Sequence, residues 1–167
     1  MKAWLAAFLV VPSVAARAQS SEPSSAPAFH SRGAFFALSV ADLDASVRWY
    51  AEKLGLTVVM RPPKQERAQI AVLEGGGLIV ELLQHDDAVP LARAFPSATA
   101  SYQVHGLFKA GMIVDDFDAT LATLEARGVT IAMGPFPASP TQHANVIVRD
   151  NSGNLIQFFG PDVSRTR

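Results

Sequence analysis

The sequence predicts an α+β fold made of two βαβββ modules, and three observations predict it. Residues 35–55 (FFALSVADLDASVRWYAEKLG) share a plan with residues 109–128 (KAGMIVDDFDATLATLEARG). In both stretches an apolar strand ends at Val, an acidic turn follows and a helix ends at Gly, with offsets of 74 residues at the valines and 73 at the glycines. Three further strand-like segments follow each stretch. A repeat of this size in 167 residues indicates two copies of one supersecondary unit.

The strands are indicated by short apolar or alternating runs that are bounded by turn residues. The long connection between the modules is expected to hold a short helix near 91–95. The expected strands are 35–40, 56–60, 69–73 and 78–83 in module one (34–84), and 109–114, 129–133, 144–149 and 155–159 in module two (105–160).

Each module is expected to contain one amphipathic helix. In module one Asp44 is a suitable N-cap for a helix over 45–54, and Gly55 suits its C-terminal end. In module two Asp118 is expected to cap a helix over 119–127. Trp49 falls beside the apolar stripe and could serve a subunit contact. The residues expected on the buried faces are Val47, Tyr50, Ala51 and Leu54 in the first helix, and Leu121 and Leu124 in the second.

Each helix has a single apolar stripe and should therefore cover one face of its own four-stranded sheet. The other faces are then left to form a shared, open, barrel-like cleft of eight strands, where a ligand would bind. Strand alternation predicts the residues that face this cleft. They are Phe35, Ala37 and Ser39; Ile79, Glu81 and Leu83; Lys109, Gly111 and Ile113; and Leu155, Gln157 and Phe159.

The N-terminal residues read as an export signal. A basic start, an apolar run over 3–14 and the segment Ala16-Arg17-Ala18 predict a signal peptide, residues 1–18, cleaved before Gln19. A Ser/Pro-rich spacer is expected at 19–32, the folded domain at 33–161 and a loose tail at 162–167. The alternative is an uncleaved or disordered N-terminal segment. We expect the product to be periplasmic or secreted, with no membrane association after cleavage.

Composition excludes several classes of function. Without Lys2 and Arg17 the 14 basic residues fall to 12 against 15 acidic ones, a net charge of about −3. No basic run stands out, which argues against a nucleic-acid partner. The chain has no cysteine, so thiolate ligands and thiol nucleophiles are excluded. No phosphate loop, dinucleotide motif or serine nucleophile elbow is present, and no cofactor is expected.

Three motifs in order resemble the vicinal oxygen chelate superfamily, which includes glyoxalase I, extradiol dioxygenases and bleomycin- and fosfomycin-resistance proteins. The resemblance covers about residues 33–160 and implies the glyoxalase/bleomycin resistance/dioxygenase fold, often as a homodimer, while the reaction stays open because this fold hosts many chemistries. The motifs are V-x-D-L-x-x-S-x-x-(W/F)-Y-x-x-x-L-G (Val40, Asp42, Leu43, Ser46, Trp49, Tyr50, Leu54, Gly55), V-D-D-x-D…L…R-G from Val114, and D-x-x-G-N (Asp150, Gly153, Asn154).

The resemblance also locates the metal site of metal-dependent relatives, which takes a His, a Glu, a His and a Glu from four strands. The matching positions here are Phe35, Glu81, Lys109 and Gln157. Phe offers no donor, a protonated Lys repels a cation and Gln is a poor ligand, so one carboxylate remains. We therefore expect no metal at this site.

The remaining polar groups suit a small anionic or carbonyl-bearing ligand in a mostly apolar cleft. Phe35, Ser39, Glu81, Lys109 and Gln157 are the expected ligand-binding residues. One hypothesis is a binding protein that sequesters a small molecule. A second is a lyase- or isomerase-like enzyme in which Glu81 is a general base and Lys109 holds an oxyanion. A third is an interaction subunit with a plugged cleft. Glu81 and Lys109 could also simply pair with each other.

Overall fold

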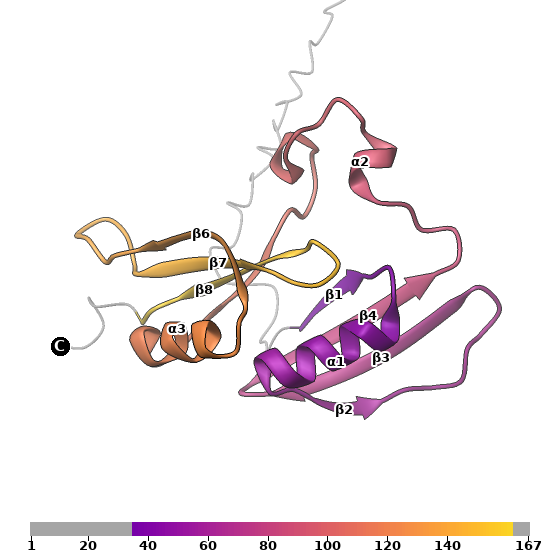
Figure 1. The fold of residues 1–167 in the computed structure, drawn as a ribbon, viewed down its shortest axis with the longest axis horizontal. Helices are drawn as coiled ribbons and strands as arrows, with labels where there is room; N and C mark the ends of the chain where they lie inside the picture. The colour runs from indigo at the N-terminus through magenta and orange to yellow at the C-terminus, as the bar shows by residue number, and fades with distance from the viewer. Residues whose placement is uncertain (1–34, 162–167) are drawn as a thin grey trace, which may run out of the picture. The chain divides into compact units, whose positions relative to one another are not determined.

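The computed structural model describes residues 35–161, and Figure 1 shows their order of strands and helices. The predicted signal peptide, spacer and C-terminal tail lie outside these residues. A π-helical turn, Tyr50–Leu54, continues the first helix, and a short 3-10 turn, Ser101–Gln103, precedes the second module. The elements are β1 (Phe35–Ser39), α1 (Leu43–Trp49), β2 (Thr57–Met60), β3 (Ala68–Gly75), β4 (Leu78–His85), α2 (Leu91–Ala94), β5 (Ala110–Ile113), α3 (Phe117–Ala126), β6 (Thr130–Phe136), β7 (Asn145–Arg149) and β8 (Leu155–Phe159).

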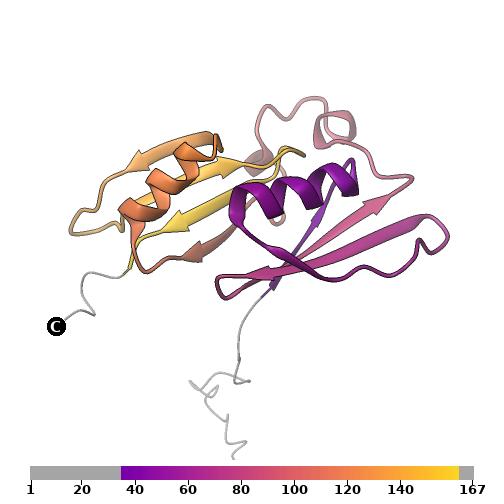
Figure 2. The same cartoon turned by 60° about the horizontal axis from the view of Figure 1, so that its bottom comes forward.

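The strands form two four-stranded sheets of the same topology, which confirms the predicted α+β fold of two βαβββ modules. Their orders are β1-β4-β3-β2 and β5-β8-β7-β6. In each sheet the first strand of the module pairs in parallel with the last, and the other neighbours pair antiparallel. The two sheets are not hydrogen-bonded to each other. Figures 1 and 2 show α1 and α3 side by side, on the same side of the two sheets.

The core lies between each helix and its sheet. Alternate residues of β3, β4, β7 and β8 face the helices and are fully buried. Because residues of both modules belong to one continuous cluster, the core joins the modules as well as filling them. The fully buried strand residues are Ala71, Leu73, Val80, Leu82, Val146, Val148 and Ile156.

Both helices begin two residues earlier than the sequence predicted. Asp42 and Asp116 are the N-caps, and each carboxylate accepts the backbone N–H of the residue three positions on at 2.9 Å. Both have the extended backbone of an N-cap residue. Asp44 and Asp118, the predicted caps, lie in the first turns, where their negative charge favours the helix N-terminus.

The π-helical turn explains why the repeat offset falls from 74 residues to 73. A π turn accommodates one extra residue in an α-helix, and module one has one more residue in this segment than module two. Ala51, which the sequence placed on the buried face, lies in this turn and is exposed, while Tyr50 is fully buried as predicted. Ser46, which the sequence did not place on that face, is buried in α1.

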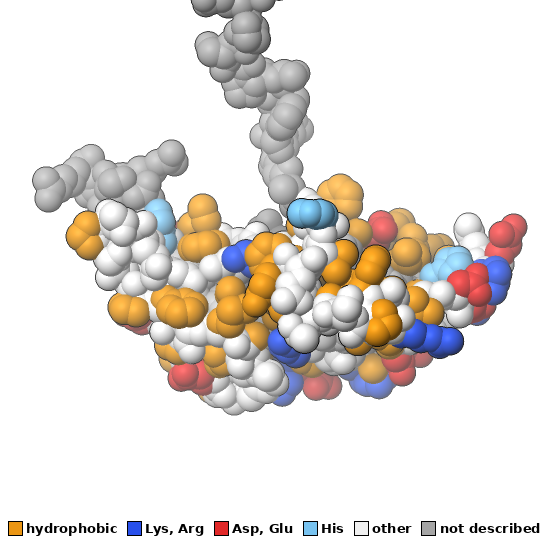
Figure 3. Space-filling model, turned by 90° about the horizontal axis from the view of Figure 1, so that it is seen from above, with side chains coloured by type: hydrophobic (Ala, Val, Ile, Leu, Met, Phe, Trp, Pro, Cys, Tyr) orange, Lys and Arg blue, Asp and Glu red, His pale blue; other side chains and the backbone are white. Residues whose placement is uncertain are grey.

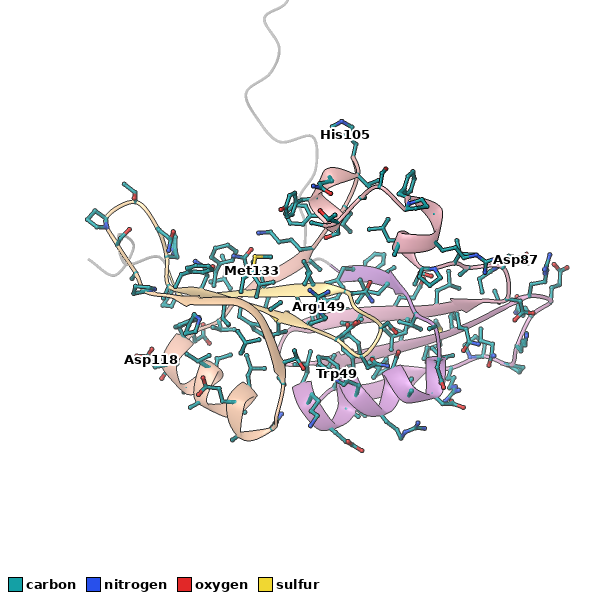
Figure 4. The ribbon with its side chains drawn as sticks, turned by 45° about the horizontal axis from the view of Figure 1, so that its top comes forward. Trp49, Asp87, His105, Asp118, Met133 and Arg149 are labelled. Atoms are coloured by element: carbon teal, nitrogen blue, oxygen red, sulfur yellow. The ribbon has the colours of Figure 1, made fainter. Side chains whose placement is uncertain are left out.

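Trp49 contacts the core rather than standing free on the surface. It is half-buried, packs against the core cluster and meets the Tyr50 ring edge-on, with the ring centroids 4.9 Å apart. Figure 4 shows Trp49 on the side of α1 that faces the sheets. The predicted subunit contact is not needed to explain this residue.

Several strands are longer than predicted. β3 and β4 form a continuous antiparallel ladder, from the pair Ala68–His85 to the pair Gly75–Leu78. β3 therefore extends past both of its predicted ends, and β4 past its predicted C-terminal end. β6 runs on to Phe136 through a cis Gly134–Pro135 bond, where a loop was predicted. Its pairing with β7 shifts register there, which a strand that contains Pro requires.

A buried hydrogen-bond network joins the two modules. The Tyr50 phenol of module one donates to an oxygen of Asp150 in the β7–β8 turn at 3.0 Å. The Asp150 carboxylate also accepts the backbone N–H groups of Ser152 and Asn154 and the Asn154 side-chain amide. Nearby, the hydroxyls of Ser46 and Ser152 lie 3.3 Å apart. Burial, reinforced by the negative Asp150, raises the pKa of Tyr50 far above its usual range.

Replacing the phenol tests this network. We expect Tyr50→Phe to lower the free energy of unfolding by about 1–3 kcal/mol, because a buried carboxylate loses a donor. Since the pKa of Tyr50 is raised in the folded state, its contribution is complete below the ordinary tyrosine pKa of about 10 and is lost as the pH rises above it. Denaturant unfolding from pH 8 to 11 should thus show a smaller alkaline loss of stability in the variant. The exposed Tyr102→Phe is the control, and equal alkaline slopes in all three proteins would contradict the prediction.

Candidate functional site

The faces of the sheets that turn away from the helices carry the candidate site. Large apolar side chains remain exposed there, among them Phe35 at 65% and Ile113 at 75%, and Leu107 of the connection before β5 is 80% exposed. Figure 3 views the molecule from the side opposite the helices and shows hydrophobic side chains spread over this surface. An exposed apolar surface of this kind marks a site of interaction.

A groove of about 960 Å³ runs between β1 and β5 on this surface. It holds both positions at which metal-dependent relatives are expected to place histidines, Phe35 and Lys109. The first strands of the two modules therefore both contribute to this groove. The side chains that give the groove its character are Phe35, Phe36, Leu107, Lys109, Met112 and Ile113.

Lys109 brings a positive charge into this apolar groove. It is half-buried, and its Nζ lies 5.1 Å from the centroid of the Phe108 ring, in the range of a cation–π contact. Within residues 35–161 no carboxylate forms an ion pair with it. Its ammonium can therefore hold an anion or a carbonyl oxygen of a ligand in the groove.

Glu81 lies beside the groove but does not line it. It sits on β4 next to Ala37 of β1, and Ala37 lines the groove. Glu81 is half-buried, and no ion pair joins it to Lys109 in the part of the chain that the structure describes. The direct Glu81–Lys109 pair, one of the alternatives from the sequence, is therefore not formed.

Gln157 is engaged within its own sheet. Its side chain is 5% exposed, and its Nε2 donates to Asn145 Oδ1 at 2.9 Å. Asn145 in turn donates to the backbone carbonyl of His143 at 3.0 Å. The sequence placed Gln157 on the open face of the sheet but gave no sign of its partner, and the side chain does not line the groove.

Ser39 lies in a different hollow. A space of about 430 Å³ separates the end of β1 from the connection between the modules, and Ser39, Leu91 and Phe108 are among its lining residues. It adjoins the groove at Leu107, which lines both. The connection thus shapes the site, which the sequence did not indicate. Figure 4 shows His105 at the outermost part of this connection, pointing away from the sheets.

The residues at the four expected metal positions do not fit a metal ion. Two of them line the groove, one lies beside it and one is buried in the second sheet. Among residues 35–161 no three His, Cys, Asp or Glu side chains lie together in a way that could hold a metal. An ammonium and a phenyl ring in place of two imidazoles remove the donors that such a site requires.

Comparisons with solved structures agree with the architecture. A glyoxylase/bleomycin resistance protein/dioxygenase domain from Frankia sp. EAN1pec is 22% identical, with a TM-score of 0.65 over 82% of this chain and 96% of that one. TnmS3, an antibiotic binding protein from Streptomyces sp. CB03234, is 20% identical, with a TM-score of 0.55 over 80% and 98%. TioX from Micromonospora sp. ML1 is 23% identical, with a TM-score of 0.53 over 80% and 98%. At these identities the likeness shows the fold alone.

No curated protein matches the chain. The family model of the Glyoxalase/Bleomycin resistance protein/Dioxygenase superfamily matches residues 32–158, nearly all of the expected domain. The two βαβββ modules, the repeated acidic caps and this match lead to one conclusion. The chain belongs to the Glyoxalase/Bleomycin resistance protein/Dioxygenase superfamily.

Proposed function

We propose that this protein binds a small, largely apolar molecule in the groove between β1 and β5, outside the cytoplasm and without a metal. The ligand carries an anionic group or a carbonyl, which Lys109 holds. The observation that carries the proposal is the half-buried Lys109 ammonium among apolar groove residues. A broad apolar lining with few charged groups, here Lys109 and Asp115, is typical of small-molecule sites.

Two further findings support binding rather than another use of the groove. Its volume, about 960 Å³, lies in the range of small-molecule sites. One structural neighbour, TnmS3, is described as an antibiotic binding protein. The neighbour shows that this fold can serve binding, and the groove residues supply the argument for this chain.

The second candidate is a lyase- or isomerase-like enzyme, and the position of Glu81 favours it over other chemistries. Glu81 adjoins Ala37 in the wall of the groove and forms no ion pair among the described residues. Its carboxylate could take a proton from a ligand whose oxyanion Lys109 stabilises. Under this candidate both residues are catalytic, whereas under the first Glu81 is dispensable.

Substitution of the two residues separates the candidates. The ligand for this test is a molecule captured with the protein and identified by native mass spectrometry. We expect Lys109→Met to weaken its binding about 10-fold or more, because a charge-assisted contact is lost. Glu81→Gln should leave that affinity within about 2-fold. Lys64→Met, which alters a lysine paired with Asp86 away from the groove, is the control. Calorimetric titration measures the affinities. Equal affinities of wild type and Lys109→Met would refute the binding mode, and turnover lost in Glu81→Gln would establish the enzyme.

The metal-free character is tested directly. We expect protein purified without an affinity tag to contain well below one equivalent of Mn, Fe, Ni, Co or Zn, since the donor set is incomplete. Inductively coupled plasma mass spectrometry measures the content, and chelator treatment should leave ligand affinity unchanged. One tightly bound equivalent would be evidence against the proposal.

Export is tested at the N-terminus. We expect the protein recovered from a bacterial host to begin at Gln19, because cleavage follows Ala18. Intact-mass measurement of the periplasmic or secreted fraction gives the N-terminus. Replacement of Ala16 and Ala18 by bulky residues should block processing. A mature chain that keeps Met1 in the cytoplasmic fraction would contradict the prediction.

The homodimer and the absence of a nucleic-acid partner stay predictions from the sequence. Within residues 35–161 no helix is both long and apolar enough to cross a membrane. The exposed apolar residues that flank the groove give a second copy a surface to contact, and analytical ultracentrifugation of the purified protein would determine the oligomeric state.

A further inference from the structure

The internal repeat predicts that each contact between the modules should occur twice, and one of them does not. The strand registers identify the equivalent positions. Val58 pairs with Leu73 in module one, and Ile131 pairs with Val148 in module two. Two residues beyond each of these partners lies the start of a hairpin turn, so Gly75 takes the place of Asp150. The same repeat places Leu124 of α3 where the first helix has Tyr50.

The Tyr50 half of the repeat is filled. The Tyr50 ring is fully buried between the first helix and the β7–β8 turn, and its hydroxyl reaches Asp150. Ser46 adds a contact to Ser152 and accepts a hydrogen bond from Asn151 at 3.1 Å. Side chains therefore occupy the space between this helix and the turn of the other module.

The Leu124 half of the repeat is hollow. Leu124 is shorter than Tyr, and Gly75, in place of Asp150, has no side chain and lies close against Leu56. A cavity of about 490 Å³ lies between α3 and this turn, and we refer to it as the seam cavity. The apolar part of its lining includes Leu54, Leu56, Leu78, Met112, Leu124 and Phe158.

Two cations lie at one end of the seam cavity, where the helices of both modules end. Arg127 Nη1 donates to the carbonyl of Lys53 at 3.1 Å, and Lys53 Nζ donates to the carbonyl of Arg127. Both residues line the cavity, and the carboxylates of Asp115 and Asp116, at the N-terminal end of α3, line it too. A guanidinium has five N–H donors and an ammonium three, so this reciprocal pair retains donors for an anion. In the described part of the chain neither side chain forms an ion pair with a carboxylate.

We propose that the seam cavity is a second binding site, which takes a small ring-bearing carboxylate or sulfonate. The rings of the ligand lie against Leu124 and Leu78. Its anionic group lies at Lys53 and Arg127. The site does not depend on the groove between β1 and β5, and its volume lies within the range of small-molecule pockets.

The seam cavity adjoins the groove, so the experiment must tell them apart. Both are lined by Leu78 and Met112, among others. Leu124 lines only the seam cavity of the two, and Ile113 lines only the groove. Their methyl groups therefore report separately on the two sites in a methyl NMR spectrum.

The probe is 1-anilinonaphthalene-8-sulfonate, titrated into the protein that begins at Gln19. We expect the chemical shifts of the Leu124 methyl groups to follow a saturable binding curve as the probe is added, independently of any change in the Ile113 methyl signals. Thr123→Phe, which adds a ring to a cavity-lining position on α3, should weaken this curve about 10-fold or more. Ala122→Phe adds the same ring to an exposed position on the same helix that does not line the cavity, and should leave it unchanged.

The charge requirement has its own variants. Arg127→Gln should weaken the Leu124 curve about 3- to 10-fold, and Lys109→Met should not alter it. Thermal unfolding confirms that each variant is folded. The proposal is overturned if only Ile113 responds to the probe, or if Thr123→Phe binds as tightly as Ala122→Phe. The groove fails instead if Ile113 never responds while Leu124 does, so the two proposals stand or fall separately.

Discussion

The hydrogen bond between the Tyr50 phenol and the Asp150 carboxylate is the constraint on which the arrangement of the two modules depends. Both groups are buried, and a buried carboxylate is costly unless its oxygens are satisfied. Backbone and side-chain N–H groups of the β7–β8 turn satisfy part of that need, and Tyr50 from the other module supplies the rest. The contact therefore joins the two modules, together with the core cluster that both modules share.

The two halves of the repeat share a plan but differ in how they fill it. In each module an Asp caps the helix, two residues after the Val that follows the module's first strand. The two helices end next to each other, where the side chains of Lys53 and Arg127 each donate to the other residue's backbone carbonyl. Only one half has a tyrosine and an aspartate to close the space between helix and turn. The other half has a leucine and glycines there, and the seam cavity lies beside them.

Periodicity and the repeat were enough to predict the strands, their βαβββ order along the chain and the open face of the sheets, because these depend on which side chains must be buried. The first residue of each helix was predicted wrongly, since Asp42 and Asp44 both suit an N-cap and the backbone geometry chose between them. The meeting of Phe35 and Lys109 in one groove followed from the repeat. The Gln157–Asn145 bond and the contribution of Leu107 did not, because they depend on cross-strand pairing and on the path of an irregular connection.

The substitutions at the metal positions change what the groove can recognise. A metal ion polarises a ligand oxygen through an empty coordination position, so metal-dependent relatives need several donors that converge on one point. Here Lys109 carries its own charge on a flexible chain beside the Phe108 ring, and Phe35 adds apolar surface where an imidazole would stand. An ammonium can hold an oxygen without other protein ligands, and Gln157 forms a hydrogen bond to Asn145 within its own sheet. The groove therefore offers apolar surface and an ammonium, the two features on which the proposed binding depends.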